Sequence, residues 1–401
     1  MSDLHQAVAC WLGPDTAKEV GDEHQRTPED VVEWVRPHWR RLGITRLADI
    51  TGLDVVGCPV ATCFRPNART LSVAQGKGTT VMAAKASAVM EAVEFAHAER
   101  AHHDLTVASI DELRTDRRRL VHPDRLPRYG GTRTRSEVPL SWTGGTDLVD
   151  GSSTLVPWDA VHLDHVRRRR GPGAALTSSS NGLAAGADRA EAVTHALCEL
   201  IERDALVRLE RGTDVDGAWI DPASVQDPTC RSLLDRLAAA ELIVEIVALS
   251  TPAAVPVLVA EVRPRVDDPF RPLAPAGGAG CHLDPATALR RALTEAAQTR
   301  LIDIAGVRDD LADEHYERLR ATPTTAARPD EPPRTVPFHE VDDIESASTH
   351  DDVATLVGAL GRLGAAPVAV DLTDPELGIP VVKVLATGVG DLPAMMTGRS
   401  W

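Results

Sequence analysis

Three stretches of the chain carry no glycine or proline except at their ends, and they constrain the fold more than any other feature. They cover residues 79–103, 190–211 and 284–306 and are rich in alanine, leucine, glutamate and arginine, which favour helices. In the third, Asp284 followed by Pro285 is typical of a helix N-terminus. We therefore predict three long helices, each with an apolar side that other parts of the chain must cover.

Segments rich in β-branched residues predict strands between and after these helices. They are residues 54–66, 154–163, 242–250, 255–264 and 367–388, the last with two strands. Strands and helices alternate without strict βαβ spacing. We therefore expect a mixed α/β (α+β) fold rather than a doubly wound sheet.

Two segments are expected to lie outside the packed fold. Residues 1–22 are acidic and poorly patterned, which favours a tail or a loosely docked segment. Residues 322–336 are rich in proline, threonine and alanine and predict a flexible linker or insertion. Shorter helices are expected over 27–42 and 351–364.

Composition and charge exclude several classes of protein. A hydrophobic content of 43% suits a globular core, and a formal net charge of −16 argues against general binding to nucleic acid or anionic membranes. Six cysteines without a Cys-x-x-Cys pair indicate neither a disulfide framework nor a zinc knuckle. With no signal sequence and no long apolar run, we expect a cytoplasmic protein.

Two of the predicted helices carry acids along one stripe. If these helices face each other, their carboxylates suit Mg²⁺, which takes a few hard oxygen ligands together with nucleotide phosphates. Two glutamates three residues apart more often mark a solvated face, so only the combination favours a site. The stripes consist of Ser87, Glu91 and Glu94 on the first helix and Glu191, His195, Glu199 and Glu202 on the second.

Basic residues add two further signals. Lys77 lies between Gly76 and Gly78, where backbone amides could approach an anion while the ammonium acts as a point charge. The spacing of a P-loop is absent, so this pattern alone does not identify a nucleotide site. Arg291 and Glu295, four residues apart on the third helix, form either a surface salt bridge or an arginine directed at a phosphate.

The order of three motifs resembles the YcaO family of ATP-dependent enzymes that modify peptide backbones. The motifs are "GKGTT" followed by "SAVMEAVE", then "SSSNGLAAGADRAEAVTHALCELIERDA", then "RRALTEAAQTR". The resemblance covers residues 23 to 395 and implies one large catalytic domain over 23–401. The segments "ITRLADITGLDVVGCPVATCFRPNARTLSVAQGKG" and "DLTDPELGIPVVKV" look most like the branch encoded beside TfuA proteins, which is associated with thioamide formation.

The resemblance implies roles for the charged residues. Glu91, Glu94, Glu199 and Glu202 would hold Mg²⁺ against ATP, and Glu191 would belong to the same nucleotide site. Ser87 opens the first family motif, and Lys77 lies in the family's glycine turn. Three further residues match family positions that lie at the phosphate end of the nucleotide or support that end. They are Arg203, Arg291 and Glu295.

The chain departs from the family pattern at two positions. Phe95 stands where many members have arginine, and Ala187 stands where asparagine is usual. A rearranged ATP site is one reading of these departures, whereas the retained acids argue against an inactive enzyme.

The resemblance leaves three functions open. A nucleophile adds to the amide carbon, ATP phosphorylates the oxygen and phosphate departs, which gives a thioamide with an external sulfide donor. With a neighbouring Cys, Ser or Thr side chain the product is an azoline. The chain ends "DLPAMMTGRSW" rather than in a proline-rich tail, which favours the thioamide. A non-catalytic scaffold that binds a precursor peptide is the third reading.

Partners are also implied by the resemblance. The 22 residues before the first helix leave no room for a leader-recognition domain, so peptide recognition or sulfur delivery is expected to need a TfuA-like partner. The substrate is expected to be a ribosomally synthesised precursor peptide, and a homodimer is compatible with the family.

Overall fold

The computed structural model describes residues 4–18, 24–100, 104–128, 133–166, 176, 178–213, 215–266, 273–306 and 335–389. The helices are α1 (Gln6–Leu12), α2 (Pro28–Val35), α3 (Trp39–Leu42), α4 (Val81–Arg100), α5 (Ile110–Thr115), α6 (Arg189–Arg211), α7 (Pro228–Ala239), α8 (Pro285–Ala305) and α10 (Thr349–Arg362). The strands are β1 (Arg46–Asp49), β2 (Val60–Phe64), β3 (Val73–Lys77), β4 (Thr106–Ala108), β5 (Leu140–Asp147), β6 (Ser153–Pro157), β7 (Leu183–Ala185), β8 (Asp216–Ile220), β9 (Leu242–Ser250), β10 (Val257–Pro264), β11 (Ala276–Cys281), β12 (Thr335–Val336), β13 (Pro367–Asp371) and β14 (Val381–Ala386).

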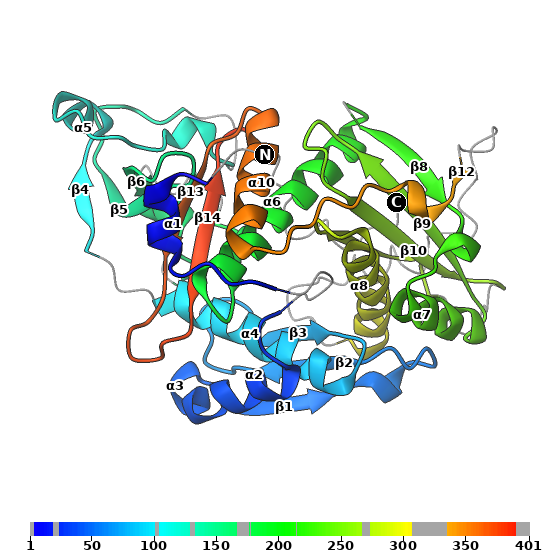
Figure 1. The fold of residues 1–401 in the computed structure, drawn as a ribbon. Coiled ribbons are helices and arrows are strands. Elements are labelled where there is room, and N and C mark those ends of the chain that lie inside the picture. The colour runs from blue at the N-terminus through cyan, green and yellow to red at the C-terminus, as the bar shows by residue number, and fades with distance from the viewer. Residues whose placement is uncertain are drawn as a thin grey trace.

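The strands form three sheets, which confirms the expected mixed α/β fold. A three-stranded sheet has the order β1-β2-β3, and a five-stranded sheet has the order β11-β10-β9-β8-β12. The third sheet runs β4-β5-β13-β14-β7, with β6 paired to β5. All pairs between strands are antiparallel except β12 with β8. Figure 1 shows the two larger sheets on either side of α6.

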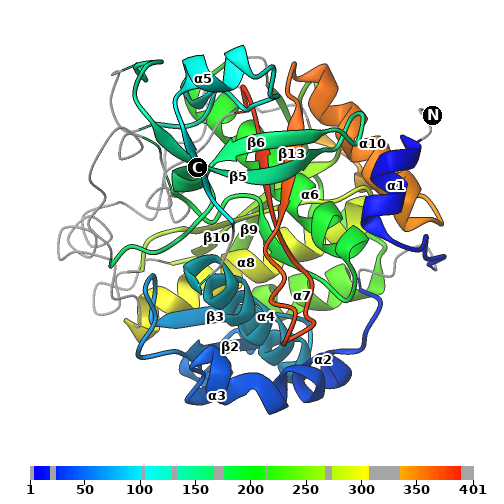
Figure 2. The same cartoon turned by 90° about the vertical axis from the view of Figure 1, so that its left-hand side faces the viewer.

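The three long helices are confirmed and each packs on a different sheet. The helix α4 lies on β2 and β3, α6 contacts β7 and β14, and α8 covers β10 and β11. Figure 2 shows β2 and β3 beside α4 in the lower half of the view. Within the described ranges, no helix is long and apolar enough to cross a bilayer.

Three predicted elements are shorter than expected, and each is bounded or interrupted by a proline. The strand predicted over 154–163 ends as β6 at Pro157, and a 3₁₀ turn follows at Trp158–Ala160. The helix predicted over 27–42 begins as expected, with the Thr27 side chain accepting a hydrogen bond from the backbone N–H of Asp30. It then passes into a 3₁₀ turn at Arg36–His38, because Pro37 has no N–H to donate. The strand predicted over 54–66 starts only at Val60, directly after Pro59.

The glycine-rich strand β11 was not predicted, since glycine is rare in strands. Its role is close packing against α8. A Cβ added to Gly280 would lie 2.1 Å from the carbonyl oxygen of Ala288, and one added to Gly278 would lie 2.3 Å from that of Ala292. Small residues here let α8 approach the sheet closely.

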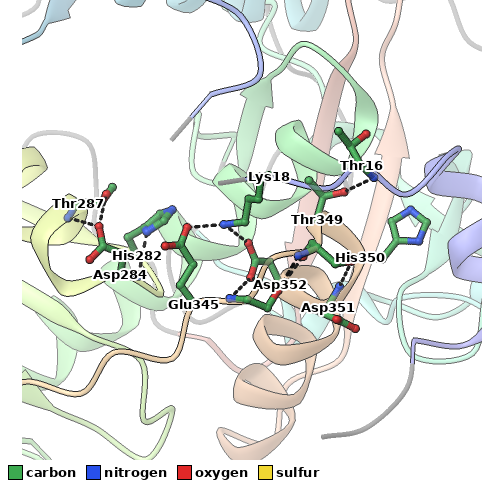
Figure 3. Close-up of polar contacts among 12 residues, drawn as sticks. Thr16, Lys18, His282, Asp284, Thr287, Glu345, Thr349, His350, Asp351 and Asp352 are labelled. Atoms are coloured by element: carbon green, nitrogen blue, oxygen red, sulfur yellow. Dashed lines mark hydrogen bonds and ion pairs between the residues drawn. The ribbon is translucent and has the colours of Figure 1, made fainter. Parts of the chain in front are cut away.

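The segment expected as an N-terminal tail is packed over its described residues. Val8 and Leu12 of α1 are buried in the core that surrounds α6. Lys18 forms ion pairs with Glu345 and Asp352, as Figure 3 shows. Of the expected linker over 322–336, the part before β12 lies outside the described residues.

Candidate active site

The structure brings all ten side chains predicted for a site into the wall of one cavity. Its volume is about 510 Å³, and it lies where β3, α4, α6 and α8 meet. The predicted residues that line it are Lys77, Ser87, Glu91, Glu94, Glu191, Glu199, Glu202, Arg203, Arg291 and Glu295. The acids of the two helices therefore converge on one space.

The glycine beside Lys77 serves packing. A Cβ added to Gly76 would lie 2.1 Å from both the carbonyl oxygen of Ala84 and the backbone nitrogen of Ala88. Gly76 thus allows β3 to lie directly on α4. We expected glycine here to let an anion approach the backbone, but the atoms that approach Gly76 belong to the neighbouring helix.

Three of the four carboxylates expected to hold Mg²⁺ accept hydrogen bonds from backbone amides. Glu91 accepts from the N–H of Gln75 on β3. Glu94 accepts from the N–H of Ala185 on β7 at 2.8 Å, and Glu199 accepts from the N–H of Gly182 at 2.9 Å. Main-chain donors at the edges of two sheets therefore fix the positions of acids on α4 and α6.

The turn that holds Glu199 is itself anchored by a buried lysine. Lys383 on β14 is 1% exposed and donates from Nζ to the carbonyl oxygens of Ser179 at 2.6 Å and Asn181 at 2.7 Å. Gly182 has a φ of 74°, and a Cβ there would lie 2.3 Å from the carbonyl oxygen of Val384. Glycine is required at this position both for its backbone conformation and for the close contact.

Basic side chains lie among these acids. Arg203 lies 3.6 Å from Glu202 and 3.8 Å from Glu199, measured between guanidinium nitrogens and carboxylate oxygens. Lys77 forms an ion pair with Glu295. Nη2 of Arg291 on α8 lies 3.4 Å from Nδ1 of His195 on α6.

The grouping of the acids changes their pKa values. Burial raises the pKa of Glu94 well above its ordinary value, and the charges of Glu91 and Glu199 act in the same direction. Burial also raises the pKa of Glu199, and it raises that of Glu202 to about 7.

Glu295 behaves differently from these three acids. Burial alone would raise its pKa, but the charges of Lys77 and Arg203 outweigh that effect and hold the pKa below its ordinary value. The pKa of Glu295 is therefore lowered, whereas the pKa values of Glu94, Glu199 and Glu202 are raised.

The residues present fit a magnesium ion and a polyphosphate. Carboxylate oxygens are hard ligands that Mg²⁺ prefers, and buried acids with raised pKa values gain from a cation. Across the part of the chain that the structure describes, no three His, Cys, Asp or Glu side chains form a ready-made metal site. Mg²⁺ commonly completes its ligand set with phosphate oxygens and water.

The cavity also contains residues that the sequence did not single out. His24, Arg26 and Trp34 line it, and the Arg26 guanidinium lies 4.3 Å from the centre of the Trp34 ring. These residues precede the long helices and belong to no recognised motif. Phe95 and Ala187, the two departures from the family pattern, also line the cavity.

Arg300 plays a structural part elsewhere. It lies near Arg291 in sequence, but it pairs with Asp54 through Nε at 3.0 Å, and it is absent from the lining of the cavity. The pair joins α8 to the turn before β2.

Comparisons with known proteins show which family this chain matches. A family model described as YcaO cyclodehydratase, ATP- and Mg²⁺-binding, matches residues 75–389. An uncharacterised protein from the tfuA 3′ region of Rhizobium leguminosarum bv. trifolii is 43% identical over 309 residues, or 75% of this chain and 72% of the relative.

Solved structures share the fold. YcaO from Methanopyrus kandleri, bound with AMPPCP and Mg²⁺, gives a TM-score of 0.69 at 25% identity. The match covers 94% of this chain and 99% of the Methanopyrus chain. A heterocyclase in complex with substrate and cofactor gives a TM-score of 0.78 at 20% identity. That match covers 94% of this chain but only 54% of the heterocyclase, and at this identity it shows the fold alone.

Proposed function

Because the chain belongs to the YcaO family, whose cofactors are ATP and Mg²⁺, we propose that it converts a backbone amide of a precursor peptide into a thioamide. ATP-dependent peptide modification is the activity of the family. The thioamide product is supported by the 43% identity to a protein from a tfuA region and by the branch-like segments described above. The observation that carries the proposal is the convergence of Glu91, Glu94, Glu199 and Glu202 on one cavity.

An amide oxygen is a poor leaving group without activation, and the resonance that gives the C–N bond partial double-bond character also makes the carbonyl carbon a weak electrophile. ATP supplies the phosphoryl group that makes this oxygen leave, and Mg²⁺ offsets the phosphate charge. In this proposal the four glutamates hold the metal, and Lys77, Arg203 and Arg291 stabilise charge that grows on the phosphates. Glu295 positions Lys77 through their ion pair.

An azoline-forming cyclodehydratase is the second candidate, favoured by the shared fold of the heterocyclase. Mass spectrometry of a peptide treated with the enzyme, ATP, Mg²⁺ and sulfide separates the two. A thioamide adds about 16 Da, because sulfur replaces oxygen, whereas an azoline loses about 18 Da as water. Loss of water in the presence of sulfide would rule out thioamide formation on that peptide.

We also propose that a TfuA-like protein is the partner of this chain. The relative's location in a tfuA region supports this pairing. Co-purification of this chain with the TfuA-like protein of its own genome, followed by the peptide assay with and without it, tests the pairing. A homodimer remains an additional proposal, which light scattering can test.

A further inference from the structure

Three exposed apolar side chains lie near the C-terminal end of α8. They are Leu53, Val55 and Ile304, which are 55%, 74% and 36% exposed. Leu53 and Val55 belong to the turn between β1 and β2, and Ile304 lies in the last turn of α8. We call these three residues the apolar rim.

One ion pair brings the members of the rim together. Arg300 on α8 donates to Asp54 through Nε at 3.0 Å and through Nη2 at 3.4 Å, and both side chains are buried. Asp54 lies between Leu53 and Val55 in the chain. Ile304 follows Arg300 by four residues and therefore lies on the same side of α8. The three apolar side chains thus surround one buried polar contact.

The turn that carries two members of the rim is firmly held. Val56 and Cys58 are buried in the core that α7 and α8 share with the five-stranded sheet. The carbonyl oxygen of Gly57 accepts a hydrogen bond from Nη1 of Arg236 on α7 at 3.0 Å. A surface that is already ordered loses little conformational entropy when a ligand binds to it.

The rim adjoins the larger of two neighbouring cavities, the one that contains the predicted site. Thr299 and Asp303 line this cavity, and each directly precedes Arg300 or Ile304 on α8. Gly78 also lines it, and its N–H donates to the carbonyl oxygen of Pro59, at the end of the turn before β2, at 3.2 Å. Figure 1 shows β3 beside the lower half of α8. A ligand that leaves the cavity over the end of α8 therefore reaches the rim.

The size of the rim selects the kind of ligand. A stable interface between folded proteins covers about 800 Å² on each partner, far more than three side chains provide. An extended peptide, in contrast, places only a few side chains on its partner. Asp54 and Arg300 compensate each other's charge, so the rim suits an apolar side chain better than a charged one.

The dimensions of the helix set a spacing for that side chain. An α-helix with its side chains is about 10–12 Å across, and an extended chain rises about 3.3 Å per residue. A peptide that passes from the cavity side of α8 to the rim therefore needs about three residues or more.

We propose that the apolar rim binds an apolar side chain of the precursor peptide, three or more residues from the amide that the enzyme modifies. This inference rests on the proposed function, because the amide must enter the larger cavity. The rim acts on peptide binding and leaves phosphoryl transfer unchanged, since none of its three residues is among those that line the cavity. It thereby selects peptides with Leu, Ile, Val or Phe at the right distance from the modified bond.

A charge placed on the rim tests the proposal. The probe is the fluorescein-labelled precursor peptide encoded beside this gene, and Mg²⁺–AMPPCP keeps it unmodified during fluorescence anisotropy. We expect Val55→Asp to raise the Kd of the peptide at least about fivefold, because a carboxylate replaces an apolar contact. Ile304→Asp should act likewise, and the Kd for Mg²⁺–AMPPCP should stay within about twofold. The matched control is Val107→Asp on β4, where the valine is 70% exposed.

Substitutions in the peptide identify the side chain that meets the rim. Each Leu, Ile, Val and Phe of the peptide is changed to serine, one at a time. One change, three or more residues from the modified bond, should raise the wild-type Kd at least about fivefold but that of Val55→Asp less than about twofold, since the contact is already lost. Additive effects at every position overturn the proposal, and so does an unchanged peptide Kd in Val55→Asp.

Two further outcomes would assign the rim to another occupant. If Val55→Asp changes the oligomeric state in light scattering while the peptide Kd is unchanged, the rim contacts a second copy of the chain. If it abolishes co-purification with the TfuA-like protein and leaves the peptide Kd unchanged, the rim contacts that protein. Either result overturns the proposal.

Anisotropy needs no product, so this inference and the proposed function can fail separately. If the peptide Kd depends on Val55 but mass spectrometry finds no thioamide, the thioamide function fails and the peptide site stands. If thioamides form and the KM for the peptide is the same in Val55→Asp as in the wild type, the function stands and this inference fails.

Discussion

Nζ of Lys77 on β3 and the carboxylate of Glu295 on α8 form an ion pair, although 218 residues separate them in the sequence. The pair joins the three-stranded sheet to the helix that covers the five-stranded sheet, in the wall of the larger cavity. Lys77, together with Arg203, holds the pKa of Glu295 below its ordinary value despite burial. The site is therefore assembled from parts of the fold that are distant in the chain.

Replacing Lys77 with methionine should weaken the enzyme through two effects. The cavity loses a cation near the proposed phosphate position, and the pKa of Glu295 rises because burial is less opposed. We expect kcat for peptide-dependent ATP hydrolysis to fall by about 10- to 100-fold. Lys85→Met on α4, away from the cavity lining, is the control. A Lys77→Met enzyme with wild-type kcat would remove Lys77 from the site.

The buried acids predict that the metal-free protein loses stability as pH rises. Glu202 has a pKa of about 7, above its ordinary value, so its contribution is fully present below about pH 4.5 and is lost as pH rises through about 7. The raised pKa values of Glu94 and Glu199 act in the same direction, whereas the lowered pKa of Glu295 acts oppositely, at acidic pH.

Thermal unfolding between pH 5 and 8 checks this expectation. The loss due to Glu202 should be on the order of 2–3 kcal/mol, and Mg²⁺–AMPPCP should restore it. Glu202→Gln should flatten the pH dependence, and Glu210→Gln, exposed on the same helix, should not. If the metal-free wild-type protein became more stable over this range, the assignment of a protonated carboxyl cluster would be wrong.

Gly76→Ala should destabilise the protein strongly. The added methyl group would lie 2.1 Å from two backbone atoms of α4, so strand and helix would have to separate. We expect the free energy of unfolding to fall by at least about 3 kcal/mol, measured by chemical denaturation. Gly52→Ala is a suitable control, because nothing lies within 4 Å of its added Cβ. Equal stability of the two variants would contradict the close contact.

Lys383→Met should affect the use of Mg²⁺ more than the binding of the peptide. The variant loses both hydrogen bonds that hold the turn preceding Gly182, whose N–H positions Glu199. The Mg²⁺ concentration for half-maximal activity should rise about tenfold, while the KM for the peptide should change less than threefold. A parallel change in both values would indicate general damage to the fold instead.

The sequence predicted the long helices well because their signals are local. A long stretch without glycine or proline favours a helix through its own residues. Asp284 before Pro285 likewise marks the start of α8 without any tertiary contact. The contacts that position the acids could not be predicted, because they are main-chain amides of Gln75, Gly182 and Ala185 brought close by tertiary packing.

The N-terminal segment shows a second limit of sequence reasoning. Its acidic composition indicated a tail, but Val8 and Leu12 need only a short helix to reach the core, and Lys18 finds its acidic partners more than 300 residues later. Ion pairs between residues so far apart leave no periodic pattern in the sequence from which they could be predicted. The same reason explains why His24 and Trp34 were not expected in the cavity wall.

The central claim is that acids of α4 and α6 together hold a metal-bound ATP. Crystals grown with AMPPCP and Mn²⁺ in place of Mg²⁺ test it directly, because anomalous scattering locates the manganese. We predict a peak about 2.2 Å from carboxylate oxygens of both helices, with ligands among Glu91, Glu94, Glu199 and Glu202. Manganese and nucleotide bound outside this cavity, or metal held without any of these four residues, would contradict the account.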